Sequence, residues 1–187
     1  MRVIAGKYRS RVLKKPGKLR LRPTSDALRE TLFNVLGPAV EDSLFIDLFA
    51  GTGAIGVEAI SRGAREVILV ESHAAAARLI RQNLESLGIR EGAEIIEADA
   101  IRGLEKLAAR HLAADFIFLD PPYENEEDYD RVLEFLDPSH LLAPSGIVIV
   151  EHRESTELPE RFTRLERSRI LEQGDAALSF YRLAAAA

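Results

Sequence analysis

The sequence predicts an α/β fold built on a parallel β-sheet. Short apolar segments alternate with longer segments of helical periodicity along most of the chain. This alternation is typical of β-α-β units, whose strands lie parallel. The chain has 187 residues, enough for one domain with its own core. With 47% hydrophobic and 29% charged residues, the composition is that of a globular protein and excludes intrinsic disorder as the main state.

The first predicted helix begins shortly after a proline. Pro23 disfavours the helical conformation of the residue before it, so this helix starts beyond that point. Thr24 or Ser25 can accept a backbone hydrogen bond and cap it. An apolar stripe with helical spacing follows and stops at Gly37-Pro38, which predicts the end of the helix there.

Strands and helices then alternate up to residue 150. The predicted strands are residues 44–48, 66–70, 93–97, 115–119 and 146–150. The predicted helices between them are residues 54–62, 73–87, 100–110 and 127–136. Two further segments, 162–170 and 177–183, have the pattern of a terminal antiparallel pair.

Charge separates the N-terminal segment from the rest of the chain. Residues 1–22 contain nine Lys or Arg and no acid, so a net charge of −5 leaves −14 (−5 − 9) for the remainder. A basic segment on an acidic body indicates contact with nucleic acid, and a solvated tail is the alternative. The candidate RNA contacts are Lys7, Arg9, Arg11, Lys14, Lys15, Arg20 and Arg22.

We interpret residues 1–22 as a β-hairpin extension and residues 23–187 as the main domain. Two apolar runs, Val3-Ile4-Ala5 and Val12-Leu13, are the candidate strands of the hairpin. Its turn lies either near Gly6-Lys7 or within residues 14–18.

Residue types exclude several functional classes. The chain has no cysteine, which excludes disulfides, thiolate metal sites and cysteine nucleophiles. We expect no metal site, because the four histidines are scattered without ligand spacing: His73, His111, His140 and His152. No apolar run approaches the roughly 20 residues that span a bilayer. We therefore expect a cytoplasmic protein without membrane contact. The sequence leaves the oligomeric state open, and a monomer is our expectation.

A glycine-rich turn follows the first predicted strand. Gly51, Gly53 and Gly56 have the G-x-G-x-x-G spacing, and Glu71 ends the next strand. In Rossmann-like sheets such a turn brings backbone close to a nucleotide, and the acid binds the ribose diol. Asp47, beside the turn, would repel the pyrophosphate of NAD and attract a cationic ligand.

Three acids follow three successive strands. Asp47, Glu71 and Asp99 lie at the strand ends beyond which ligands bind in open α/β sheets. S-adenosylmethionine carries a sulfonium and an ammonium and no phosphate, so it fits this acidic series better than NAD does. Asp99 is placed to accept a hydrogen bond from the adenine amino group.

A second motif, Asp120-Pro121-Pro122-Tyr123, follows the fourth strand. The prolines fix the backbone and remove two N–H donors, so carbonyl oxygens and the Asp120 carboxylate can face an amino group. An exocyclic NH2 is a poor nucleophile because its lone pair is delocalised. Acceptors on its N–H bonds favour a tetrahedral nitrogen with a free lone pair. Tyr123 offers a face for stacking, whereas a rigid turn with a packed tyrosine is the structural alternative.

The D-P-P-Y tetrapeptide resembles the signature of amino-group methyltransferases that use S-adenosylmethionine. The chain as a whole resembles the bacterial 16S ribosomal RNA guanine-N2 methyltransferases of the small subunit. The matching stretches are MRVIAGKYRS from residue 1, RPTSDALRETLFNVL from residue 22, DLFAGTGAIGVEA from residue 47, DFIFLDPPY from residue 115 and LAPSG from residue 142. They extend over residues 1 to about 151, and the segment after Arg153 is generic.

This resemblance implies a Rossmann-like methyltransferase fold with a seven-stranded, mostly parallel sheet whose last strand is antiparallel. It implies methyl transfer to the N2 of one guanine in 16S ribosomal RNA of the small ribosomal subunit. The residues implied at the target amine are Asp120, Pro121, Pro122 and Tyr123. The residues implied at the cofactor are Thr24, Asp47, Ala50, Gly51, Thr52, Gly53, Glu71, Ser72, Asp99 and Ala100.

Three other functions share part of this pattern. The glycine motif and Glu71 also fit an NAD oxidoreductase, but Asp47 and D-P-P-Y do not. A non-catalytic RNA-binding module would not need Asp120 and Tyr123. A DNA amino methyltransferase shares the chemistry but usually adds a target-recognition region, for which 187 residues leave little room.

Overall fold

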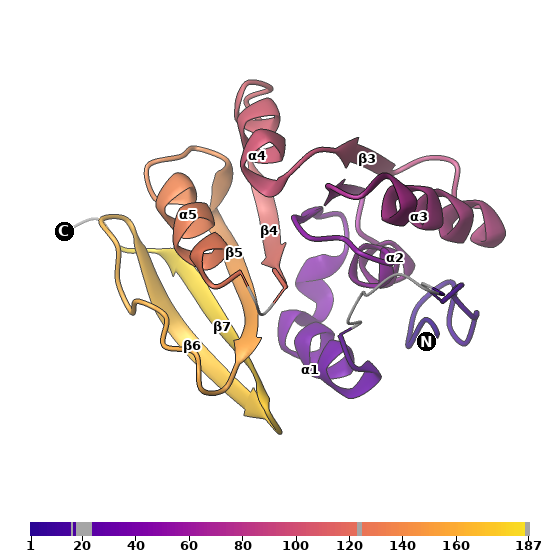
Figure 1. Cartoon of the computed structure of the whole chain (residues 1–187), viewed down its shortest axis with the longest axis horizontal. Helices are drawn as coiled ribbons and strands as arrows, with labels where there is room; N and C mark the ends of the chain where they lie inside the picture. Colours follow the sequence, from indigo (N-terminus) through magenta and orange to yellow (C-terminus); the bar gives the residue numbers. More distant parts are fainter. Residues whose placement is uncertain (16, 18–23, 123–124, 186–187) are drawn as a thin grey trace.

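The computed structural model describes residues 1–15, 17, 24–122 and 125–185, and shows one sheet flanked by helices (Figure 1). Its strands are β1 Leu44–Asp47, β2 Glu66–Glu71, β3 Ala93–Glu97, β4 Ala114–Leu119, β5 Leu142–Arg153, β6 Leu165–Gln173 and β7 Ala176–Leu183. Its helices are α1 Asp26–Leu36, the short 3-10 helix η1 Gly37–Val40, α2 Ala54–Ser61, α3 Ala74–Leu87, α4 Ala100–Ala108 and α5 Glu127–Leu136.

The seven strands lie in the order β3-β2-β1-β4-β5-β7-β6. Strands β1 to β5 are parallel, and β7 is antiparallel to both β5 and β6. The predicted α/β class and the seven-stranded, mostly parallel sheet are therefore confirmed. The strand order reverses between β1 and β4, and ligands bind in the crevice outside the carboxyl ends of strands at such a point.

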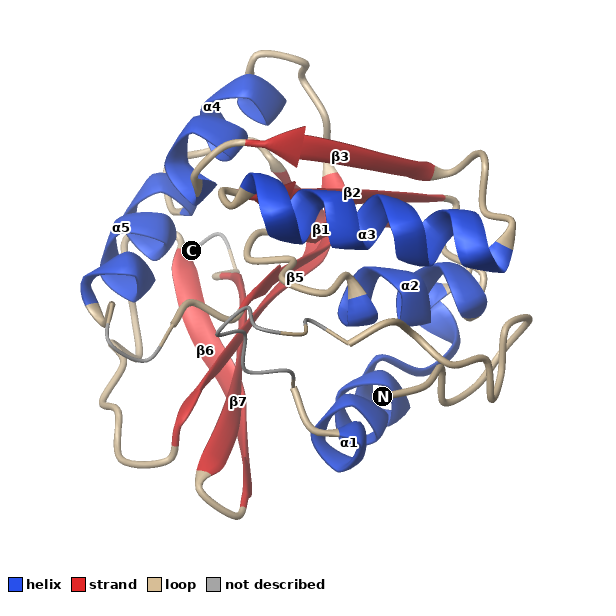
Figure 2. Ribbon diagram, turned by 45° about the vertical axis from the view of Figure 1, so that its right-hand side comes forward, coloured by secondary structure: helices blue, strands red, loops and turns tan. Residues whose placement is uncertain are grey.

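Two hydrophobic cores cover the two faces of the sheet. One contains apolar side chains of α1, α2 and α3, and the other contains those of α4 and α5. Figure 2 shows this division, with α4 and α5 together on one side and α1, α2 and α3 on the other. Ser25 caps α1 by accepting a hydrogen bond from the Leu28 N–H at 3.1 Å, which settles the choice between the two predicted caps.

The largest difference from the predicted elements is the length of β5. The strand begins at Leu142, four residues before the predicted start, and its register with β4 shifts between Ala114 and Phe116. Pro144 lies in the added stretch, where it cannot donate a ladder hydrogen bond. Gly146 permits the close approach, because a Cβ there would lie 2.8 Å from the Ala114 carbonyl oxygen. The last pair is also displaced, since β6 begins at Leu165 and not at residue 162.

The N-terminal segment doubles back on itself near Gly6. The Val3 N–H donates to the Arg11 carbonyl oxygen and the Ser10 N–H to that of Val3, each at 2.9 Å. The turn thus falls at the first of the two predicted places. Among residues 1–15 the antiparallel pairing amounts to one bridge, Arg2 with Val12, rather than a ladder of two strands.

This segment is attached to the helical layer by buried contacts. Val3 and Leu13 belong to the core of the α1–α3 face, with 2% and 1% of their surface exposed. The Glu58 carboxylate accepts hydrogen bonds from the backbone of Ile4 and Ala5, at 2.7 and 3.0 Å. The Lys14 N–H donates to Asn83 Oδ1 at 2.8 Å. The basic charges therefore project from a backbone that packs against the domain.

Candidate active site

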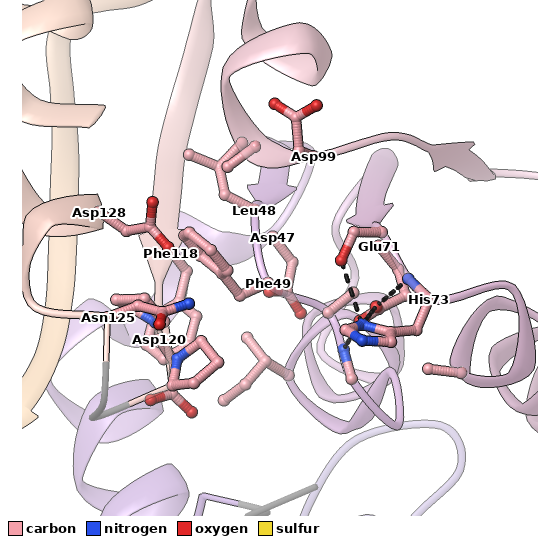
Figure 3. Close-up of a pocket in the computed structure, with 18 of the residues that line it drawn as sticks. Asp47, Leu48, Phe49, Glu71, His73, Asp99, Phe118, Asp120, Asn125 and Asp128 are labelled. Carbon is pink, nitrogen blue, oxygen red and sulfur yellow. Dashed lines mark hydrogen bonds and ion pairs between the residues drawn. The ribbon is translucent and has the colours of Figure 1, made fainter. Parts of the chain in front are cut away.

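A cavity of about 780 Å³ lies beyond the carboxyl ends of β1, β2 and β4. Figure 3 shows Glu71 and His73 on one side of the cavity and Asp120, Asn125 and Asp128 on the other, with Asp47 between the two groups and Asp99 above it. The volume lies within the range typical of small-molecule sites. The cavity occupies the crevice expected from the strand order.

The glycine-rich turn forms one wall of the cavity. Gly51 and Gly53 have φ of 52° and 77°, a left-handed conformation that favours glycine, and Gly53 is the N-cap of α2. Gly56 has a different role, because a Cβ there would lie 2.7 Å from a methyl group of Leu69. The motif therefore serves both the turn and the close packing of α2 on β2.

Glu71 is fixed by backbone donors on both oxygens. The Gly51 N–H donates to Oε2 at 2.8 Å, and the His73 N–H donates to Oε1 at 2.7 Å. The residue is 6% exposed and lines the cavity. Each carboxylate oxygen can accept a second hydrogen bond, so Glu71 presents an oriented pair of acceptors to a ligand.

Asp47 is a buried carboxyl group with no hydrogen-bond partner among the described residues. It is 1% exposed, and neither oxygen makes a hydrogen bond of ordinary geometry. Burial, with a smaller contribution from the charge of Glu71, raises the pKa of Asp47 to about 7, although the nearby amides of Phe49 and Gly56 oppose the rise. Because Asp47 lines the cavity, a cationic ligand would compensate the cost of its burial.

We expect Asp47→Asn to stabilise the ligand-free protein above pH 7. With the folded pKa of Asp47 raised from 3.8, its contribution to the free energy of unfolding falls as the pH rises from about 4 to about 7. The loss is at most about 4 kcal/mol, and asparagine does not incur it. Urea unfolding of both proteins at pH 5 and pH 8 measures this difference. Equal stability of the two at pH 8 would contradict the burial of an ionised Asp47.

Asp99 occupies a more exposed part of the wall. Its side chain accepts a hydrogen bond from the Arg102 N–H at 3.1 Å and so caps α4, and it forms an ion pair with the Arg102 side chain at 3.5 Å. The carboxylate is 52% exposed and lines the cavity. Asp99 therefore starts the helix and also offers an acceptor to a ligand.

The other side of the cavity is formed by the loop after β4 and the end of β5. Asp120, Pro121 and Pro122 line it, and Tyr123 lies outside the described residues. The Thr24 hydroxyl donates to Glu151 Oε2 at 2.8 Å and lies 3.4 Å from Asp120 Oδ2. A buried polar cluster thus joins the start of α1 to the ends of β4 and β5.

Most of the predicted site residues meet in this one cavity. Those that line it are Thr24, Asp47, Ala50, Gly51, Thr52, Glu71, Ser72, Asp99, Ala100, Asp120, Pro121 and Pro122. Gly53 lies behind the wall, where a Cβ would be 3.2 Å from the Ile80 side chain. Lining residues that the sequence analysis did not identify include Phe49, Ile101, Asn125, Asp128, Arg131 and Arg153.

Several predicted RNA contacts lie on the outer side of the N-terminal segment. Lys7, Arg9 and Lys15 are exposed, and Lys7 Nζ lies 5.2 Å from the centre of the Tyr8 ring. Arg11 and Lys14 are exposed but donate to the Ser86 carbonyl oxygen and to Gln82 on α3. Arg20 and Arg22 lie outside the described residues.

Two other features concern metals and membranes. The described part of the chain contains no group of three His, Cys, Asp or Glu side chains that could hold a metal ion. His152 is buried, and its ring nitrogens contact the Arg153 carbonyl oxygen and the Ser179 hydroxyl. None of the described helices is both long enough and apolar enough to cross a membrane.

The sheet order and the cavity beyond β1 and β4 define a Rossmann-like methyltransferase fold. The chain belongs to the family described as "Conserved hypothetical protein 95", which matches residues 1–182. It is 35% identical to "Putative rRNA methyltransferase YlbH" of Bacillus subtilis, over 97% of this chain and 98% of that protein. It is 34% identical to "Ribosomal RNA small subunit methyltransferase D" of Escherichia coli K12, over 85% and 78% of the two chains.

A solved structure has the same architecture. The structure described as "Putative methyltransferase yhhF from Escherichia coli" has a TM-score of 0.85 and 30% sequence identity. The match covers 100% of this chain and 99% of that chain. The whole described fold, including the terminal antiparallel strands, is therefore common to both proteins.

Proposed function

We propose that this protein transfers a methyl group from S-adenosylmethionine to the exocyclic N2 of a guanine in 16S ribosomal RNA of the small ribosomal subunit. The observation that carries the proposal is that Asp120-Pro121-Pro122 and the unpaired buried carboxyl of Asp47 line one cavity. The similarity to ribosomal RNA methyltransferases along the whole chain supports the substrate class. Such a substrate would place the protein in the cytoplasm.

The residues around the glycine-rich turn fit S-adenosylmethionine. The Asp47 carboxylate would receive the cationic methionine end, for which a buried, unpaired acceptor is suited. Glu71, held by two backbone amides, would accept from the ribose hydroxyls, and Asp99 from the adenine amino group. The cofactor supplies a methyl group on a positively charged sulfur. NAD fits less well, because its pyrophosphate would lie beside Asp47.

The turn after β4 would hold the nucleophile. We assign Asp120 and the backbone carbonyl oxygens of Pro121 and Pro122 as acceptors for the guanine amino group, and Tyr123 as the face on which the base stacks. S-adenosylmethionine, when bound, would supply its methyl carbon to the N2 lone pair, and its sulfur would leave as a neutral thioether. Asp120 would stabilise the positive charge on the methylated nitrogen until that nitrogen loses a proton to solvent.

The exposed cations of the N-terminal segment would bind the RNA phosphates. Contacts of this kind provide affinity and orientation without reading sequence. Residues 1–22 would thus act as an RNA-binding extension of a methyltransferase domain formed by residues 23–187. The backbone of this extension packs on α2 and α3, so its function has to be tested through its charges.

We expect replacement of Lys7, Arg9 and Lys15 by glutamine to reduce the salt dependence of RNA binding. If five cations of the wild type contact phosphates, the logarithm of the RNA association constant falls with the logarithm of the salt concentration with a slope of about −3.5. Removing three of these contacts reduces the slope to about −1.4. Filter binding of unmodified 16S ribosomal RNA at several salt concentrations measures the slope.

Glutamine at Lys106, Arg169 and Arg182 is the matched control, because these exposed residues lie in α4, β6 and β7, whereas the N-terminal segment packs on α2 and α3. These substitutions should leave the slope unchanged. Equal slopes for both variants would contradict a specific role of the N-terminal charges.

Transfer of labelled methyl groups tests the proposed substrate. The protein is incubated with labelled S-adenosylmethionine and either small subunits lacking the modification, naked 16S ribosomal RNA or duplex DNA. We expect label in one or both ribosomal substrates and none in DNA. Labelling of DNA alone would show that the protein is a DNA amino methyltransferase.

A further inference from the structure

Glu151 is a buried acid that neither the glycine-rich turn nor the D-P-P-Y motif includes. It is 3% exposed and directly follows the part of β5 that pairs with β4, the strand that Asp120 follows. The Thr24 hydroxyl donates to its Oε2 at 2.8 Å. Its charge also contributes to the raised pKa of Asp47. Glu151 therefore lies close to the residues of both halves of the cavity.

Thr24 is the residue that connects the two carboxylates. It is 9% exposed, and its hydroxyl oxygen lies 2.8 Å from Glu151 Oε2 and 3.4 Å from Asp120 Oδ2. A hydroxyl group has one hydrogen to donate, so the two carboxylates share it: Glu151, at the shorter distance, receives the stronger hydrogen bond and Asp120 the weaker one. Ser25, the N-cap of α1, fixes the backbone next to Thr24. The start of α1 therefore fixes the position from which the Thr24 side chain reaches Glu151.

We propose that Thr24 and Glu151 are positioning residues that orient Asp120 toward the target amine. This inference rests on the proposed function, in which Asp120 accepts from the amine. The carboxylates of buried Glu151 and half-buried Asp120 repel each other, and a hydroxyl that donates to both stabilises one mutual arrangement. Without it, Asp120 would lose a fixed neighbour and sample orientations that do not face the amine. This role concerns the amine and not the cofactor, although Thr24 lines the shared cavity.

The test compares Thr24→Val, which removes the hydroxyl at constant shape, with Thr24→Ser, which keeps it. In single turnovers on small subunits lacking the modification, we expect Thr24→Val to be about 10- to 100-fold slower than the wild type. Thr24→Ser should stay within about threefold, and the affinity of both variants for S-adenosylhomocysteine should stay within about threefold. Glu151→Ala should resemble Thr24→Val in both measurements.

Thr31→Val is the matched control. Thr31 lies in α1 and donates a hydrogen bond of the same length, 2.8 Å, to Gln173 at the surface. This variant should transfer methyl groups at the wild-type rate. Thermal melting of every variant shows whether a loss of transfer rate results from unfolding. If Thr24→Val is unfolded, Thr24→Ser and Glu151→Ala still test the role of the hydroxyl and of its acceptor.

Two results would overturn the positioning role. One is a folded Thr24→Val protein that turns over at the wild-type rate. The other is a rate loss matched by an equal loss of affinity for S-adenosylhomocysteine, which would make Thr24 a cofactor contact. A wild-type protein that methylates no RNA would instead overturn the proposed function, so the two failures are distinguishable.

Discussion

Replacement of Asp120 by alanine is expected to slow methyl transfer by roughly 100- to 1,000-fold, the loss typical when a group that stabilises transition-state charge is removed. Asp120 lines the cavity directly after β4, 3.4 Å from the Thr24 hydroxyl. In the proposed reaction it accepts from the amine and faces the charge that develops on nitrogen. The loss should therefore appear in the single-turnover rate.

Affinity for S-adenosylhomocysteine, measured by calorimetry, should remain within a few-fold of the wild-type value in Asp120→Ala. Asp128→Ala is the matched control, because Asp128 also lines the cavity but lies in α5, paired with Arg131 at 3.1 Å. It should retain far more activity than Asp120→Ala. An Asp120→Ala protein within tenfold of the wild-type rate would remove Asp120 from the reaction.

The largest loss of stability is expected for Glu58→Ala. The Glu58 side chain is fully buried in α2 and accepts hydrogen bonds from the backbone of Ile4 and Ala5 and, at 2.8 Å, from Arg62. Arg29, also fully buried, lies 4.0 Å away. Removing one member of a buried charge pair typically costs about 3–5 kcal/mol. Arg29 would keep its ion pair with Asp26 at 3.0 Å, but the backbone N–H groups of Ile4 and Ala5 would lose their acceptor. Burial already lowers the pKa of Arg29, and the charges of Asp26 and Glu58 oppose this shift.

Urea unfolding measures the free energy of unfolding of Glu58→Ala. The control, Arg62→Ala, removes a partner of Glu58 but leaves its hydrogen bonds from Ile4 and Ala5 in place, so it should cost clearly less than Glu58→Ala. If Glu58→Ala costs as little as the control, the N-terminal segment contributes little to the stability of the fold. A large loss would show that the fold depends on the contacts of this segment. A protein lacking residues 1–22 could then lose RNA binding simply because it unfolds.

The alternation of elements could be predicted from the sequence because each strand or helix carries its own periodicity. The start of β5 could not, since Pro144 and Gly146 within it are typical of a loop. The structure accommodates them through the register shift against β4 and the close approach to the Ala114 carbonyl. These are properties of the paired strands and are absent from the sequence of either strand.

In the candidate site too, features carried by a single segment could be predicted, whereas contacts between distant segments could not. Asp47, Glu71, Asp99 and Asp120 could be identified because each ends a strand or follows one closely, and the ends of parallel strands meet at one edge. Glu151 also follows the apolar part of a strand, but its hydrogen bond with Thr24 joins residues 127 positions apart.

The basic charges of residues 1–22 indicated contact with nucleic acid. They did not indicate which residues of the domain bind the backbone of this segment. Glu58, which accepts its hydrogen bonds, lies within the apolar helix α2. The contacts of this segment with the domain therefore became visible only in the folded chain.

Nucleoside analysis of the methylated product tests the central claim most directly. Small subunits lacking the modification are incubated with the protein and S-adenosylmethionine, and the RNA is digested to nucleosides and analysed by mass spectrometry. The proposed function predicts N2-methylguanosine as the new product, formed by the wild type and lost in Asp120→Ala. Methylation of an adenine amino group, or of a ring carbon or ribose, would contradict the assignment of guanine N2 as the acceptor.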